Sequence, residues 1–90
     1  PPPPSQKFRN FQSTLIGEKA VTTVAGIGNA LGGRLVEKGY DKAYMLLGQF
    51  LVLKKDPELF QNWLHKTCKA DSKRQKECAD CLAEYVRLHL

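Results

Sequence analysis

The sequence lacks any long apolar segment. The longest candidate, from Tyr44 to Leu53, is interrupted by Gly48 and Gln49, whereas a helix that spans a bilayer needs about 20 apolar residues. Residues 1–30 also lack the basic start, apolar stretch and cleavage site of a signal peptide. We therefore expect a soluble chain of the nucleus or the cytoplasm.

Cysteine is scarce. The chain has 3 cysteines in 90 residues, an odd number that does not suit a disulfide framework and that points to a reducing compartment. The spacings His65-x2-Cys68 and Cys78-x2-Cys81 are compatible with tetrahedral zinc. However, Cys78 and Cys81 fall on the apolar stripe of a predicted helix, and a free cysteine often packs as a small hydrophobic residue. We therefore favour core packing over zinc, and we predict no metal and no cofactor.

Catalytic groups are also missing. No serine or cysteine has a recognisable set of histidine and carboxylate partners, and His65 and His89 stand in no known motif. Acidic residues are spread along polar faces, where they are best interpreted as solvated charge. The sequence therefore predicts a protein that is not an enzyme.

Negative charge is in the minority. The 14 lysines and arginines exceed the 9 acidic residues, which gives a net charge of +5, and such an excess suits an anionic partner. The excess is concentrated between Lys66 and Lys76, where only Asp71 opposes it. This cluster is either a solvated loop and helix start or a patch that contacts phosphates.

The pattern of apolar residues is helical, with no pair of strands that could form a sheet. We predict a single all-α domain over residues 1–90, with a flexible proline-rich end at Pro1–Pro4. The expected helices begin at Ser5, near Thr22 or Thr23, at Asn29, after Asp41, after Asp56 and after Asp71. Asp56-Pro57-Glu58 is the clearest of these starts, because it combines a cap, a proline at the first position and an acid in the first turn.

The most informative segment is Gly26-Ile27-Gly28, which is followed by a predicted helix with Leu31 and Leu35 on its apolar face. Glycines allow another molecule to approach the backbone, and the first N–H groups of a helix attract a phosphate. Arg34 on the same helix is placed to reach a second phosphate. The pattern is typical of the helix-hairpin-helix, which grips nucleic-acid backbones. An ordinary glycine turn is the alternative, and a Rossmann unit fits poorly because no strand precedes the glycines.

Longer stretches of the chain resemble the barrier-to-autointegration factor family. The clearest is Leu47-Gly48-Gln49-Phe50-Leu51-Val52-Leu53-Lys54-Lys55-Asp56. The others are Ser5-Gln6-Lys7, Gly17-Glu18-Lys19, Ala25-Gly26-Ile27-Gly28, Asp41-Lys42-Ala43-Tyr44, Leu59-Phe60, Trp63-Leu64, Thr67-Cys68 and Cys81-Leu82. The likeness covers nearly the whole chain.

This resemblance implies a helical homodimer that binds double-stranded DNA without sequence preference and bridges two duplexes. It also implies docking of LEM-domain proteins of the inner nuclear membrane, and an association with lamins. The implied DNA contacts are Ser5, Gln6, Lys7, Gly26, Ile27, Gly28, Leu31, Arg34, Ser72, Lys73 and Lys76. The implied dimer contacts are Gly48, Leu53 and Trp63, and the partner groove includes Val52 and Leu53. Ser5 is the candidate phosphorylation site, where a phosphate would add about 2 negative charges beside Lys7.

The sequence departs from the family at its beginning, where prolines replace the usual hydroxyl residues, and at Asp71, where an uncharged residue is usual. These changes leave an alternative function open. In this alternative the protein is a paralogue that keeps the dimer and the partner groove but binds DNA weakly.

Overall fold

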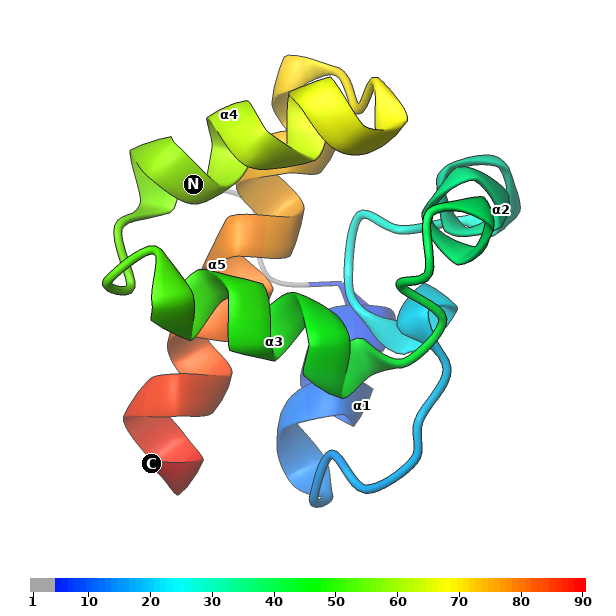
Figure 1. The fold of residues 1–90 in the computed structure, drawn as a ribbon. Coiled ribbons are helices and arrows are strands. Elements are labelled where there is room, and N and C mark those ends of the chain that lie inside the picture. Colours follow the sequence, from blue (N-terminus) through cyan, green and yellow to red (C-terminus); the bar gives the residue numbers. More distant parts are fainter. Residues whose placement is uncertain (1–4) are drawn as a thin grey trace.

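The chain is built from helices that surround one long helix, α5. The computed structural model describes residues 5–90, so the predicted flexible end at Pro1–Pro4 lies outside the described residues. The elements are α1 (Gln6–Ser13), the short 3-10 helix η1 (Val21–Thr23), α2 (Asn29–Glu37), α3 (Ala43–Val52), α4 (Pro57–Cys68) and α5 (Ser72–His89) (Figure 1). The all-α prediction is confirmed. Within residues 5–90, no helix combines the length and the apolar character needed to cross a membrane.

Local side-chain caps start three of the helices where the sequence predicted them. The Ser5 hydroxyl accepts a hydrogen bond from the Phe8 N–H at 3.1 Å, and the Asp56 carboxylate accepts from the Glu58 N–H at 2.9 Å. Asp71 caps α5 by accepting from the Arg74 N–H at 2.9 Å. These caps satisfy N–H groups that have no partner inside the helix.

The predicted cap at Asp41 is wrong. α3 begins one residue later than an Asp41 cap requires, with Lys42 in extended conformation at the cap position and no side-chain cap bond. The reason is that this segment pairs with the loop before η1. The Asp41 carbonyl accepts from the Val21 N–H at 2.9 Å, and Ala20 and Lys42 form an isolated antiparallel bridge.

The core lies where α5 meets α3 and α4. Phe60 of α4 packs edge-on against Phe50 of α3, with ring centroids 5.6 Å apart. Cys68, Cys78 and Cys81 are all buried, so the predicted core packing of the cysteines is confirmed. Burial raises the pKa of the Cys81 thiol to about 11, and it also raises the pKa of Cys68 and of Cys78.

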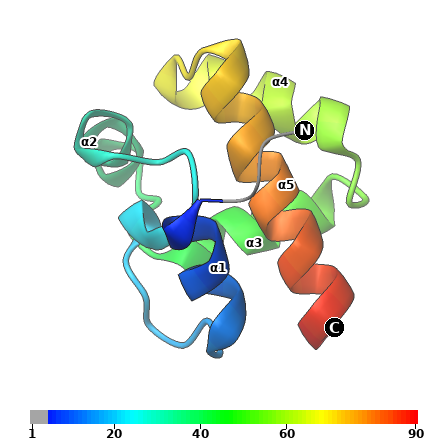
Figure 2. The same ribbon diagram turned by 180° about the vertical axis from the view of Figure 1, so that it is seen from behind.

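α1 packs along the C-terminal half of α5, as Figure 2 shows from behind. Phe11 packs on Tyr85, with ring centroids 5.4 Å apart, and the Gln12 amide donates a hydrogen bond to the Cys81 carbonyl at 2.9 Å. His89, near the end of the chain, lies with Nε2 2.9 Å from the Gln12 carbonyl oxygen. Because a carbonyl only accepts, Nε2 is the donor in this bond.

Candidate nucleic-acid interface

The glycine segment forms a tight turn that is pressed against α5. Gly26 has φ +87°, a conformation that side chains disfavour. A Cβ atom at this position would lie 2.7 Å from the Arg74 carbonyl oxygen and 3.1 Å from the Cys78 backbone nitrogen. Gly26 is therefore required both by its own backbone angle and by the close passage of the α5 backbone.

Gly28 has a different environment. It stands at the N-cap of α2 in extended conformation and makes no side-chain cap bond. Among residues 5–90, chain neighbours aside, no atom lies within 4 Å of the place where its Cβ would be, and Gly28, Asn29 and Ala30 are all exposed. The first N–H groups of α2 are therefore accessible at the positive end of the helix dipole, which is the arrangement that binds an anion.

Gly32 is a further glycine of the motif, and its role becomes visible only in the structure. It is buried in α2, and a Cβ there would collide with the methyl group of Thr22 in η1. The glycine thus allows α2 to lie directly on η1. Its position four residues after Gly28 was visible in the sequence, but the facing Thr22 was not, because that contact depends on the tertiary fold.

α1 is tied to the hairpin by Lys7. Its ammonium group donates a hydrogen bond of 2.6 Å to the Ile27 carbonyl oxygen, and burial is the main cause that lowers the pKa of Lys7. The Ile27 side chain is itself fully buried. The Ile27 N–H also donates to the Val24 carbonyl at 3.1 Å, so Ile27 anchors the hairpin in the core, while Ser5 and Gln6 are exposed.

The start of α5 carries the other predicted contacts. Ser72 and Lys73 are exposed. Lys76 forms an ion pair of 2.8 Å with Asp80, and the hydrogen bond that Lys76 donates to Asp80 raises the pKa of Lys76. The carboxylate of Asp71 caps the same helix start, so a negative charge lies next to these cations.

Three predicted segments that are distant in the sequence come together. Lys7 joins the start of α1 to the hairpin, and the close approach of Gly26 to Arg74 joins the hairpin to the start of α5. Figure 2 shows the beginning of α1 beside the turn that leads into α2. These elements form one surface, which we call the hairpin face: residues 5–7, 26–31 and 72–73. Leu31 is half-buried within it and packs against the core.

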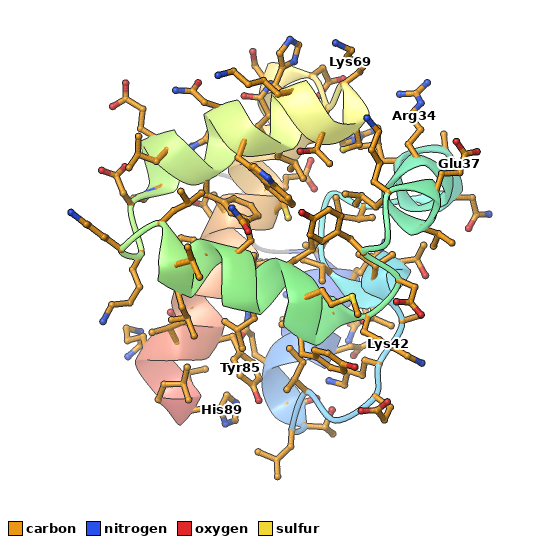
Figure 3. The ribbon with its side chains drawn as sticks, viewed as in Figure 1. Arg34, Glu37, Lys42, Lys69, Tyr85 and His89 are labelled. Atoms are coloured by element: carbon orange, nitrogen blue, oxygen red, sulfur yellow. The ribbon has the colours of Figure 1, made fainter. Side chains whose placement is uncertain are left out.

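Arg34 lies outside the hairpin face, on the side of α2 that is turned toward the end of α4. Its guanidinium donates a hydrogen bond of 3.0 Å to the Cys68 carbonyl oxygen. Figure 3 shows Arg34 and Lys69 at the same corner of the molecule.

The residues implied in the dimer contacts and in the partner groove divide into two groups. Gly48 and Val52 lie one helical turn apart on α3, and Tyr44, Gly48, Leu51 and Val52 have the spacing of one helix face. Val52 is 74% exposed and Tyr44 and Leu51 are each 40% exposed, and no atom lies within 4 Å of a Cβ at Gly48. We call this surface the α3 face. Leu53 and Trp63 are partly buried against the core, and Trp63 packs edge-on against Tyr40 at 5.1 Å.

The fold and the turn define a small all-α protein in which a glycine hairpin joins a 3-10 helix to an α-helix. Comparison with known proteins identifies the family to which such a protein belongs. The family profile described as barrier to autointegration factor matches residues 3–89. Barrier-to-autointegration factor A of Xenopus laevis is 58% identical over 81 residues, which are 90% of each chain. The Homo sapiens protein is 54% identical over 90% of this chain and 91% of its own, and the Drosophila melanogaster protein is 53% identical over 90% of each. The chain belongs to the barrier-to-autointegration factor family.

Proposed function

We propose that this chain is a non-enzymatic nuclear protein, also present in the cytoplasm, that binds double-stranded DNA without sequence preference through the hairpin face. The observation that carries the proposal is the convergence of three helix starts, fixed by the 2.6 Å bond from Lys7 to the Ile27 carbonyl and by the contact of Gly26 with α5. The site offers backbone N–H groups at the start of α2 and the lysines of residues 5–7 and 72–73. Such a surface binds phosphates and does not read sequence.

The α3 face supports dimerisation. It is apolar and exposed, it carries no charged side chain, and Gly48 leaves room for the backbone or a large side chain of a second copy. In a twofold dimer each copy contributes one hairpin face, so one dimer bridges two duplexes. We propose that Val52 and Leu53, at the end of the same helix, belong to the groove that receives LEM-domain proteins, and that lamins are further partners.

Ser5 is proposed as the site at which DNA binding is switched off. It is exposed at the start of α1, and its hydroxyl caps the helix. A phosphate on this oxygen would place about 2 negative charges next to the hairpin face and repel DNA.

A second function is favoured by two features of α5. The Asp71 carboxylate lies at the helix start, and Lys76 is already paired with Asp80. Both weaken the attraction for phosphate. A paralogue that works mainly through the α3 face and the partner groove would bind duplex DNA weakly and still dimerise.

The test is a titration of the protein with duplexes of unrelated sequence, comparing wild type with Gly28→Glu. The site at Gly28 is open and its backbone is extended, so the glutamate leaves the fold intact and places a negative charge where the phosphate would bind. We expect binding to fall at least 100-fold, and log affinity of the wild type to fall steeply with log salt concentration.

Two controls separate the effect of the glutamate's charge from the effects of its size and of its position. Gly28→Gln has the size of the glutamate without its charge, and Asn62→Glu puts the same charge on an exposed position of α4. Asn62→Glu should bind like wild type, and Gly28→Gln should bind more tightly than Gly28→Glu. Equal binding by wild type and Gly28→Glu would refute the hairpin mechanism, and a wild type that dimerises but binds no duplex would favour the second function.

A further inference from the structure

Lys69, between α4 and α5, has a backbone conformation that is unusual for its residue type. It ends α4 with φ +63° and ψ 31°, in the left-handed region, and its N–H donates to the His65 carbonyl at 2.9 Å. Glycine is the usual residue at such a helix end, because a Cβ disfavours this conformation. A residue with a long charged side chain therefore occupies a position whose backbone conformation favours glycine.

The backbone on both sides of Lys69 is held in place. The Ala70 carbonyl accepts from the Gln75 amide at 2.6 Å and lies 3.1 Å from Nδ1 of His65, and Ala70 is fully buried. The Cys68 carbonyl accepts from Arg34 of α2 at 3.0 Å. Lys69 is thus presented from a fixed loop and not from a mobile one.

Two cations meet at this corner. The hydrogen bond of Arg34 to Cys68 brings its guanidinium next to the loop of Lys69, and Figure 3 shows both residues at the same corner of the molecule. Both residues are exposed. Within residues 5–90 the ion pairs are Arg74–Glu77, Lys76–Asp80 and Arg87–Glu84, so neither Arg34 nor Lys69 belongs to an ion pair there. Neighbouring like charges repel each other, and an anion bound between them offsets this repulsion.

We propose that Lys69 and Arg34 together bind an additional phosphate of the duplex that the hairpin face holds. The loop of Lys69 joins the end of α4 to Ser72 and Lys73 of the hairpin face, and Arg34 belongs to the helix whose start forms the hairpin. The corner therefore continues the hairpin face along the outer side of α2. This inference rests on the proposed DNA binding and extends its footprint by one contact.

The experiment is the salt dependence of duplex binding by Lys69→Gly. Removing one phosphate contact should reduce the slope of log affinity against log salt by about 0.9 and weaken binding several-fold at low salt. Because glycine suits φ +63°, the melting temperature should stay the same or rise. Weaker binding by a protein of equal or greater stability would not result from a purely structural role.

Lys54→Gly is the matched control. Lys54 is also an exposed lysine with positive φ, +65°, and it lies in the loop between α3 and α4, on the opposite side of the molecule from α2 (Figure 1). The Lys54→Gly substitution removes the same charge and relieves the same backbone conformation. We expect the slope of its log affinity against log salt to equal that of wild type.

Two outcomes separate this inference from the function on which it rests. If Lys69→Gly keeps the slope of Lys54→Gly while Gly28→Glu loses binding, the additional contact is refuted and the hairpin mechanism stands. If wild type binds no duplex, the proposed function fails and the inference fails with it. A lower slope in Lys69→Gly alone supports the contact.

Discussion

The hairpin face and the α3 face use glycine for opposite purposes. At Gly26 the space beside the backbone is already filled, since a Cβ would lie 2.7 Å from the Arg74 carbonyl oxygen of α5. At Gly48 the space is empty to 4 Å, and the neighbouring Val52 is 74% exposed. The first glycine is needed for contacts within the chain. The second leaves space at the surface that only another molecule can fill.

The two surfaces also differ in chemistry. The hairpin face combines helix starts, open backbone N–H groups and lysines, all of which attract an anion. The α3 face carries Tyr44, Leu51 and Val52 and no charge, which suits a partner that is itself apolar. The difference shows why a substitution of glycine has to be judged from its surroundings: the same change disrupts folding at one face and association at the other.

The largest effect is expected from Gly48→Glu. In a dimer joined through the α3 face, two carboxylates would be buried without partners, at a cost of several kcal/mol for each. We expect the solution mass, measured by sedimentation or light scattering, to fall from that of a dimer to that of a monomer with the helical content unchanged. Gly33→Glu is the control, because no atom lies within 4 Å of a Cβ there either. A Gly48→Glu protein that remains a dimer would exclude the α3 face as the interface.

The next effect is expected from Gly26→Ala. The alanine has to adopt φ +87° and has to displace the α5 backbone, which we expect to lower the free energy of unfolding by about 3 kcal/mol. Gly28→Ala, in open space, should change it by less than about 1 kcal/mol. Urea unfolding of the two variants measures the difference. Equal stabilities would show that the hairpin does not pack on α5 in the way described.

A smaller effect concerns the buried thiol of Cys81, whose sulfur lies 3.7 Å from the Gln12 amide of α1. The pKa of Cys81 is raised in the folded protein to about 11 from an unfolded value of 9.0, so its contribution to stability is complete below pH 9 and is lost as the pH rises to about 11. Between these values the free energy of unfolding should fall by about 1 kcal/mol per pH unit for this thiol. A Cys81→Ala variant should show a shallower decline in urea unfolding at successive pH values.

Alkylation tests the same burial at neutral pH. The native protein should resist iodoacetamide at Cys68, Cys78 and Cys81, and the protein in urea should react at all of them. Rapid modification of the native protein would contradict their place in the core.

The parts of the fold that were predictable depend on neighbours in the sequence. Ser5, Asp56 and Asp71 each cap a helix within three residues, so their roles follow from local chemistry. The cap predicted at Asp41 failed because its carbonyl pairs with Val21, twenty residues earlier in the chain, and this pairing shifts the start of α3.

The candidate site shows the same limit. The glycine motif predicted a turn with an open helix start, and the structure has that helix start at Gly28. It did not distinguish Gly26, which is covered by α5, from Gly28, which is free. Nor did it indicate that Arg34 binds the carbonyl of Cys68, because the orientation of α2 against the end of α4 is set by packing across the whole domain.

The hydrogen bond between His89 and Gln12 has a consequence for how the protein is made. It joins residues 77 positions apart, and the packing of Phe11 on Tyr85 nearby spans almost the same separation. The contacts of α1 with α5 therefore form only after the residues between them have been made, since a long loop has to close first. On the ribosome α1 is synthesised well before α5, and it cannot dock on α5 until the turns that carry Tyr85 and His89 have left the exit tunnel.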